Sequence, residues 1–118
     1  MCILEEMQWM RTKLVSSSDF FHGTLELVDK DVPVFLVKGV GNCRILDERV
    51  EKFLVNHTSK LYVFDLAEYP LNHISEKYRY LVSPILLASL TRGRHCEHLE
   101  KYSGHDLNFR RYYRQFEY

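Results

Sequence analysis

Two short apolar runs with an amphipathic segment between them constrain the fold of this chain more than any other feature. Residues 32–37 form a continuous, largely β-branched run, and residues 61–65 form a second run. Between them, apolar residues recur at three- and four-residue steps, which predicts a helix over residues 45–54. A strand–helix–strand order implies a right-handed crossover and a parallel pair. We therefore predict an α/β fold with a short parallel sheet, and the continuous first run is typical of a strand buried on both faces.

Helical patterns flank this core. Apolar residues at helical steps predict a helix over residues 2–13, which begins inside the pattern without an N-cap. A Ser/Asp cluster at residues 16–19 predicts a turn that starts a short helix over residues 20–27. Residues 81–102 predict a long helix, with Pro84 near its start and Gly104 beyond its end. The tail that follows is aromatic and basic.

The composition excludes several classes of protein. The chain has 118 residues, 46% of them hydrophobic, which suits one packed domain. Sixteen basic residues balance sixteen acidic ones, so no global charge favours nucleic acid or a membrane surface. No apolar run approaches the ~20 residues that a membrane span needs, and the N-terminus lacks a signal-peptide pattern. Three scattered cysteines fit reduced thiols, and we expect a cytoplasmic protein without disulfides.

Three local patterns suggest chemistry but favour structural roles. Gly39 and Gly41 follow a strand, yet the third glycine of a dinucleotide-binding loop is absent, so we expect a tight turn and no NAD. His95 and His98 share a helix face without a second ligand cluster, so we expect no metal. Cys43 is expected to be a small buried hydrophobe, because nothing else indicates covalent catalysis.

Glu6 and His22 are the best candidates for proton transfer. A carboxylate and an imidazole suit acid–base work near neutral pH, and each lies beside aromatic residues. From residue chemistry alone, however, a lone helical Glu is usually solvated and a lone His usually structural. The tail interleaves arginines and tyrosines over residues 110–114, which suggests tyrosines packed on the protein and arginines that reach a phosphorylated ligand or a neighbouring subunit.

Six segments in register resemble the sugar isomerase (SIS) domain family, in its fructosamine and fructoselysine 6-phosphate deglycase branch. The similarity lies in residues 6–10, 20–26, 32–36, 44–50, 83–87 and 104–118. It covers essentially the whole chain and matches the later part of the second of the family's two subdomains. The expected architecture is a partial, flavodoxin-like SIS subdomain, residues 1–118, with an active-site helical segment (1–30), a strand–helix–strand (31–66), a helical segment (71–103) and the tail (104–118).

The resemblance implies roles for individual residues. Glu6 corresponds to a general base that moves a proton between C1 and C2 of a sugar phosphate. His22 corresponds to a residue that assists ring opening or protonates the leaving amine, in a site that relatives build across a dimer interface. Arg111, Arg114 and Gln115 are the expected substrate-binding residues of the tail. No cofactor or metal is implied.

Departures from the family pattern separate two hypotheses. The phosphate-binding loops of the first subdomain are absent from the chain, position 3 is Ile where the amino-sugar isomerising branch has Lys, and Gln115 stands where a lysine is common. The first hypothesis is the C-terminal part of a sugar-phosphate deglycase or isomerase that is inactive alone. The second is a non-catalytic binding or assembly module. Either is expected to form a homo-oligomer or to associate with a separately encoded first SIS half, without nucleic acid or membrane partners.

Overall fold

The structure, a computed structural model, describes residues 2–115 and 117. The chain divides into two compact units, Met1–Leu14 with Leu87–Tyr118 (unit 1) and Val15–Leu86 (unit 2). Each unit is described on its own, and the single-domain organisation expected from sequence stays a prediction. Met1 and Tyr118, the outer ends of the predicted segments 1–30 and 104–118, lie outside the described residues.

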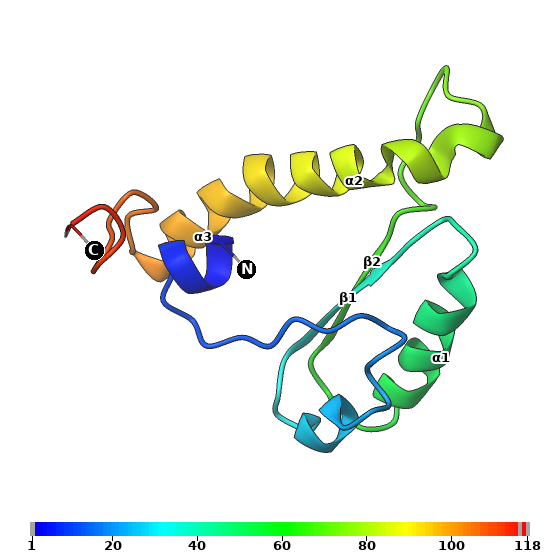
Figure 1. The fold of residues 1–118 in the computed structure, drawn as a ribbon, viewed down its shortest axis with the longest axis horizontal. Helices are drawn as coiled ribbons and strands as arrows, with labels where there is room; N and C mark the ends of the chain where they lie inside the picture. Colours follow the sequence, from blue (N-terminus) through cyan, green and yellow to red (C-terminus); the bar gives the residue numbers. More distant parts are fainter. Residues whose placement is uncertain (1, 116, 118) are drawn as a thin grey trace. The chain divides into compact units, whose positions relative to one another are not determined.

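Unit 2 contains the predicted strand–helix–strand. Strand β1 (Val34–Lys38) and strand β2 (Leu61–Asp65) pair in parallel, with Val34 opposite Leu61. Helix α1 (Arg44–Leu54) lies along one side of the two strands (Figure 1). Its buried Leu54 packs with Leu36 of β1, which forms the centre of the core. The predicted α/β class and the parallel pair are confirmed.

The prediction of a strand buried on both faces is wrong for β1. Side chains alternate along a strand, so Leu36 points to α1 while Phe35 points to the opposite face. On that face Phe35 and Tyr62 remain 56% and 49% exposed and stack on each other at a ring distance of 5.0 Å. The apolar run thus reflects two different environments, a packed face and an aromatic face open to solvent.

The glycine turn between β1 and α1 is held by side chains of the chain itself. Asp47, on the first turn of α1, accepts a hydrogen bond from the Gly39 amide at 2.9 Å and another from the hydroxyl of Ser17. Arg44 donates to the Gly39 carbonyl at 2.9 Å. These bonds satisfy the backbone of the turn, which supports its structural interpretation. Cys43 is exposed in this turn, so its prediction as a buried hydrophobe is wrong.

The carboxyl ends of both strands carry a charged network. Arg44 holds Asp65 with two parallel hydrogen bonds, of 2.8 and 2.6 Å. Lys38 lies 2.8 Å from Glu51 and 3.3 Å from Asp65. The hydrogen bonds from Arg44 hold the pKa of Asp65 well below its ordinary value, and the bond to Glu51 raises the pKa of Lys38. Every charge in this network has a partner of opposite sign.

The segment before β1 is less helical than predicted. Ser16 and Asp19 form a hydrogen-bonded turn at 2.6 Å, as expected from the cluster. The helix that follows is only a short 3₁₀ turn (Thr24–Leu27). Gly23 precedes it at φ 124°, a conformation that side chains rarely adopt, and this interrupts the helical path expected over 20–27.

Helical structure continues from residue 76 to residue 103. A 3₁₀ turn (Glu76–Tyr78) leads into α2 (Arg79–Ser89), a wide π-type segment (Leu90–His95) and α3 (Cys96–Ser103). The division between the units falls inside α2. Gly104 ends α3 in the left-handed conformation at φ 67°, with its amide bonded to the Glu100 carbonyl at 2.9 Å. The long helix and its glycine stop are confirmed, although the helix starts earlier than predicted.

The first helix, in unit 1, is shorter than predicted. A π-type helix spans Cys2–Met7 and ends where Trp9 adopts φ 56°. The amides of Trp9 and Met10 bond back to the carbonyls of Glu5 and Leu4, at 3.0 and 2.8 Å. A bulky residue at positive φ ends a helix, so the apolar pattern over 2–13 overestimated its length. In residues 2–115 and 117, no helix is long and apolar enough to cross a membrane.

Candidate active site

Helix Cys2–Met7 presents Glu6, and the C-terminal tail packs against the residues that follow this helix. Gln8, only 7% exposed, donates to the His105 carbonyl at 3.1 Å and accepts from the Ser103 hydroxyl at 2.6 Å. A buried amide with both ends satisfied fixes the position of the tail. Residues nearly one hundred positions apart in sequence are therefore neighbours within unit 1.

Trp9 forms the aromatic base of this arrangement. Its ring meets the His105 ring edge to face at 4.2 Å and lies 5.5 Å from Phe109. The guanidinium of Arg111 stacks over the Trp9 ring at 3.8 Å. A cation at this distance from an indole is attracted to the face of the ring. Trp9 thus combines the positive φ at the end of the helix with a ring that packs against the tail.

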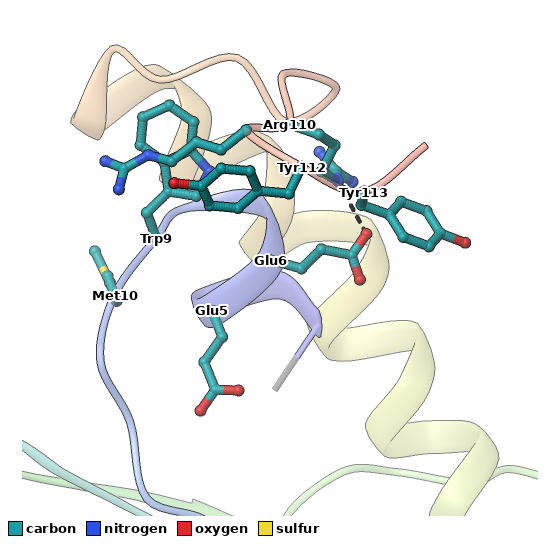
Figure 2. A pocket seen from close by; sticks show the side chains of 8 residues that line it. Glu5, Glu6, Trp9, Met10, Arg110, Tyr112 and Tyr113 are labelled. Carbon is teal, nitrogen blue, oxygen red and sulfur yellow. Dashed lines mark hydrogen bonds and ion pairs between the residues drawn. The ribbon is translucent and has the colours of Figure 1, made fainter. Parts of the chain in front are cut away.

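Glu6 is paired with Arg110 of the tail. The Nε atom of Arg110 donates to Oε1 of Glu6 at 2.9 Å, and the two side chains are 14% and 34% exposed, respectively. Arg110 also donates to the carbonyls of Leu107 and Phe109. Figure 2 shows the bond to Glu6. The carboxylate therefore has an ionic partner inside unit 1.

An open pocket of about 380 Å³ surrounds this pair. It combines two carboxylates, two guanidiniums and aromatic rings, so a ligand there could meet both charged and apolar groups. Its walls come from the first helix and from the tail (Figure 2). The lining residues are Glu5, Glu6, Trp9, Met10, Arg110, Arg111, Tyr112 and Tyr113.

The other two tail residues predicted to bind substrate line a second hollow. Arg114 and Gln115 are exposed and border a space of about 260 Å³ that Arg110 also lines. Arg114 adopts φ 59° and lies 5.2 Å from the Tyr113 ring. In the described part of the chain, neither Arg111 nor Arg114 has a carboxylate partner. Both guanidiniums can therefore contact a ligand without first breaking an ion pair.

His22 belongs to unit 2. It is exposed in a turn, with its amide bonded to the Asp19 carbonyl at 2.9 Å. The preceding Phe20 is buried in the core and contacts Phe21 edge to face at 5.1 Å. The aromatic pair anchors the turn and leaves the imidazole accessible. Because Glu6 and His22 lie in different units, their pairing stays a prediction.

Sequence reasoning missed two parts of this site. Arg111 and Arg114 were expected to bind substrate and Arg110 was given no role, because three arginines within five residues look alike in sequence. Trp9 was noted only as an aromatic neighbour of Glu6, since nothing in the sequence signals its positive φ. The only sequence clue to this site was the mixture of arginines and tyrosines in the tail, and that mixture does not show which arginine contacts Glu6.

The other residues considered for chemistry make local contacts within their own helical segment. His95 bonds through Nδ1 to the Leu90 carbonyl at 2.5 Å, and His98 lies 6.4 Å from the Tyr102 ring. Burial raises the pKa of the Cys96 thiol, which disfavours the reactive thiolate. Across residues 2–115 and 117, no three His, Cys, Asp or Glu side chains gather as a metal site.

Comparison with known proteins gives this arrangement a context, although no family model matches the chain. The fructosamine deglycase of Bacillus subtilis is 32% identical over 117 residues, which is 99% of this chain and 35% of that protein. The fructoselysine 6-phosphate deglycase of Escherichia coli K12 is 31% identical over 93% of this chain and 31% of its own length. The chain thus spans about a third of the curated relatives that it matches.

Solved structures agree with the sequence comparison. A Bacillus subtilis protein assigned as a phosphosugar isomerase superposes with a TM-score of 0.92 at 32% identity, over 99% of this chain and 35% of that chain. A Salmonella typhimurium protein with the same assignment gives 0.76 at 28% identity, over 99% and 36%. The resemblance inferred from sequence motifs is confirmed. This chain is homologous to a segment of the fructosamine and fructoselysine 6-phosphate deglycases that makes up about a third of their length, and it has the fold of the corresponding part of the phosphosugar isomerase structures.

Proposed function

We propose that this chain contributes the proton-transfer residue and an anion-binding tail to a deglycase or isomerase that acts on an amino-sugar or fructosamine 6-phosphate. The observation that carries the proposal is the pocket that Glu6 shares with Arg110 and Arg111 of the tail. The similarity to fructosamine and fructoselysine 6-phosphate deglycases supports the substrate class. Both observations concern the same residues, since the match to the Bacillus subtilis protein spans 99% of this chain.

Glu6 is the proposed general base. It takes a proton from C1 of the open-chain substrate and returns it to C2, so the carboxylate ends the transfer as it began. A positioned carboxylate is suited to this step because the proton lost lies next to a carbonyl or imine. His22 is the proposed partner that assists ring opening or protonates the leaving amine.

The tail is proposed to hold the charged substrate. Arg111 and Arg114 supply guanidiniums that can form charge-assisted hydrogen bonds with a phosphate, and Gln115 supplies an amide beside them. Trp9 and Tyr112 add apolar surface against which a sugar can rest. No cofactor or metal is needed for a proton transfer of this kind.

We expect little turnover by this chain alone. Binding energy from the remote phosphate normally positions a sugar phosphate for reaction. The matched relatives are about three times as long as this chain, and the SIS resemblance assigns the phosphate loops to the other two thirds. We therefore propose association with a separately encoded first SIS half, or with further copies of this chain, in the cytoplasm.

The open aromatic face of the sheet favours the second candidate function, a binding or assembly module without catalysis. Phe35 and Tyr62 leave apolar ring surface on a sheet of only two strands, and two strands are marginal on their own. A module of this kind would use that face to complete a larger assembly. It would bind sugar phosphate without moving a proton.

A titration with fructosamine 6-phosphate, followed by heteronuclear NMR, tests the proposal. We expect shifts at the Arg111 and Arg114 side chains and at the Trp9 indole. Unphosphorylated fructosamine, the matched control, should give much smaller shifts because it lacks the anion. The absence of any shift at these three residues would contradict the proposed function.

A turnover assay separates the two candidates. If the deglycase proposal holds, adding the complementary first half should give release of amine that Glu6→Gln abolishes. Binding without turnover in that reconstituted mixture would favour the assembly module. Turnover by the chain alone, sensitive to Glu6→Gln, would contradict the expected inactivity.

A further inference from the structure

We infer that Arg110 is the positioning residue of Glu6: it fixes one carboxylate oxygen so that the other is presented for proton transfer. This inference rests on the proposed function, in which Glu6 is the base. Arg110 touches Glu6 and the tail backbone, and its role is to act through Glu6. Neither the family resemblance nor the relatives' names assign it a part.

The guanidinium of Arg110 is itself held in place. One terminal nitrogen, Nη1, donates to the carbonyls of Leu107 and Phe109, and Nε donates to Glu6. The side chain is only 14% exposed. A planar group with three acceptors on two of its nitrogens has little freedom to rotate, so the Nε–H direction is set by the tail.

Arg110 makes one hydrogen bond to Glu6, and this bond involves only one of the two carboxylate oxygens. Oε1 accepts the bond at 2.9 Å, and within the described structure Oε2 has no hydrogen-bond donor. Asp65 in unit 2 shows the alternative, since Arg44 there occupies both of its oxygens. A one-oxygen contact orients the group and keeps the second oxygen available as a base.

The neighbouring arginine gives a natural contrast. Arg111 lies in the same pocket but stacks on Trp9 at 3.8 Å and holds no carboxylate. Arg111 therefore suits ligand binding, whereas Arg110 suits orientation of the reacting group. Two adjacent cations with separable roles allow a test in which each serves as the other's control.

An epoxide probe reads the orientation of Glu6 without requiring turnover. In 1,2-anhydrohexitol 6-phosphate, a carboxylate oxygen attacks C1 and forms an ester bond while the C1–O bond of the epoxide breaks. The electron pair stays on the O2 oxygen, which takes a proton from water, so the protein gains the mass of the whole probe. Peptide mass spectrometry locates the ester, and its time course gives kinact and KI.

We expect labelling at Glu6 in the wild-type chain and none at position 6 in Glu6→Gln. Arg110→Gln should lower kinact by about tenfold or more with KI within about twofold, since misorientation slows reaction more than binding. Arg111→Gln should do the reverse, raising KI and leaving kinact within about twofold. Arg110→Lys keeps the charge but loses the fork, so its kinact should lie between those of wild type and Arg110→Gln.

Each outcome decides the matter. Equal kinact in wild type, Arg110→Gln and Arg110→Lys, or a change in KI alone, would overturn the positioning role and leave Glu6 as the base. Absence of Glu6 labelling in the wild type would overturn the proposed function, and the positioning role with it. If circular dichroism shows that Arg110→Gln does not fold, the rate of Arg110→Lys against wild type decides.

Discussion

Two of the arginine–carboxylate contacts, one in each unit, differ in their geometry and surroundings. In unit 2, Arg44 bonds both oxygens of Asp65, and ion pairs with Lys38, Glu48 and Glu51 extend the network. In unit 1, Arg110 engages one oxygen of Glu6 at the wall of an open pocket. A carboxylate with both oxygens bonded suits a structural role, whereas a carboxylate bonded through one oxygen at a pocket wall suits the role in proton transfer that we propose for Glu6.

Among the substitutions that test this comparison, the largest loss in the free energy of unfolding should come from the core of unit 2. Leu54 is fully buried in unit 2 between α1 and the sheet. Leu54→Ala should lower the free energy of unfolding by about 3 kcal/mol, because it removes buried methyl groups and leaves a cavity. Urea denaturation measures this loss, and Leu14→Ala, at an exposed leucine, is the control. A loss below about 1 kcal/mol would mean that unit 2 is not a packed core.

Removing the saturated carboxylate should come next. Asp65→Asn leaves the Arg44 and Lys38 charges without their shared partner at a site that is mostly buried. We expect a loss of about 2 kcal/mol in the free energy of unfolding, which is below the value for a fully buried pair because Arg44 is partly exposed. Glu68→Gln, at an exposed carboxylate three residues on, should change little. Equal losses in the free energy of unfolding for the two substitutions would show that the Arg44–Asp65 contact does not stabilise unit 2.

The same network predicts a pH dependence with a definite sign. Arg44 lowers the pKa of Asp65 in the folded state, so the folded state favours the ionised carboxylate. Its stabilisation is complete above the unfolded pKa of about 4 and is lost progressively as pH falls below it. The gap in stability between wild type and Asp65→Asn should therefore shrink below about pH 4. A gap that stays constant from pH 6 to pH 3 would contradict this account.

The smallest effect on stability should be at the unit 1 pair. Glu6 is about one-third exposed, so Arg110→Gln should lower the free energy of unfolding by about 1 kcal/mol or less. Glu5→Gln, at the adjacent carboxylate, is the matched control. A cost equal to that of Asp65→Asn would make the Glu6–Arg110 contact a structural pair like the one in unit 2.

Periodicity recovered the parts of the fold that local burial dictates. The strand at 61–65, helix α1 and the glycine stop at Gly104 follow from apolar spacing and backbone preference. The same reasoning overextended the first helix, because nothing in the local pattern signals the positive φ of Trp9. It also took the exposed Phe35 for a buried residue, since an apolar strand looks alike whether or not a second layer covers it.

The candidate site divides along the same line. Glu6 and His22 were found through a family spacing, which needs no knowledge of contacts. Which arginine contacts Glu6 depends on the backbone conformation of the tail. That conformation places the Leu107 and Phe109 carbonyls where they accept hydrogen bonds from Arg110. Sequence therefore predicted Glu6 as the reacting residue and indicated the charge of the tail, while the structure showed that Arg110 contacts Glu6 and that Arg111 stacks on Trp9.

The most direct measurement of the central claim uses Trp9, the one tryptophan of the chain. Arg111 stacks on its ring, so a phosphate that draws this cation away should change the indole emission. The account predicts a saturable fluorescence change with fructosamine 6-phosphate, a much weaker one with fructosamine, and a large loss of affinity in Arg114→Gln. A flat titration, or equal responses to the phosphorylated and unphosphorylated sugars, would contradict the claim that the tail and Glu6 form a sugar-phosphate site.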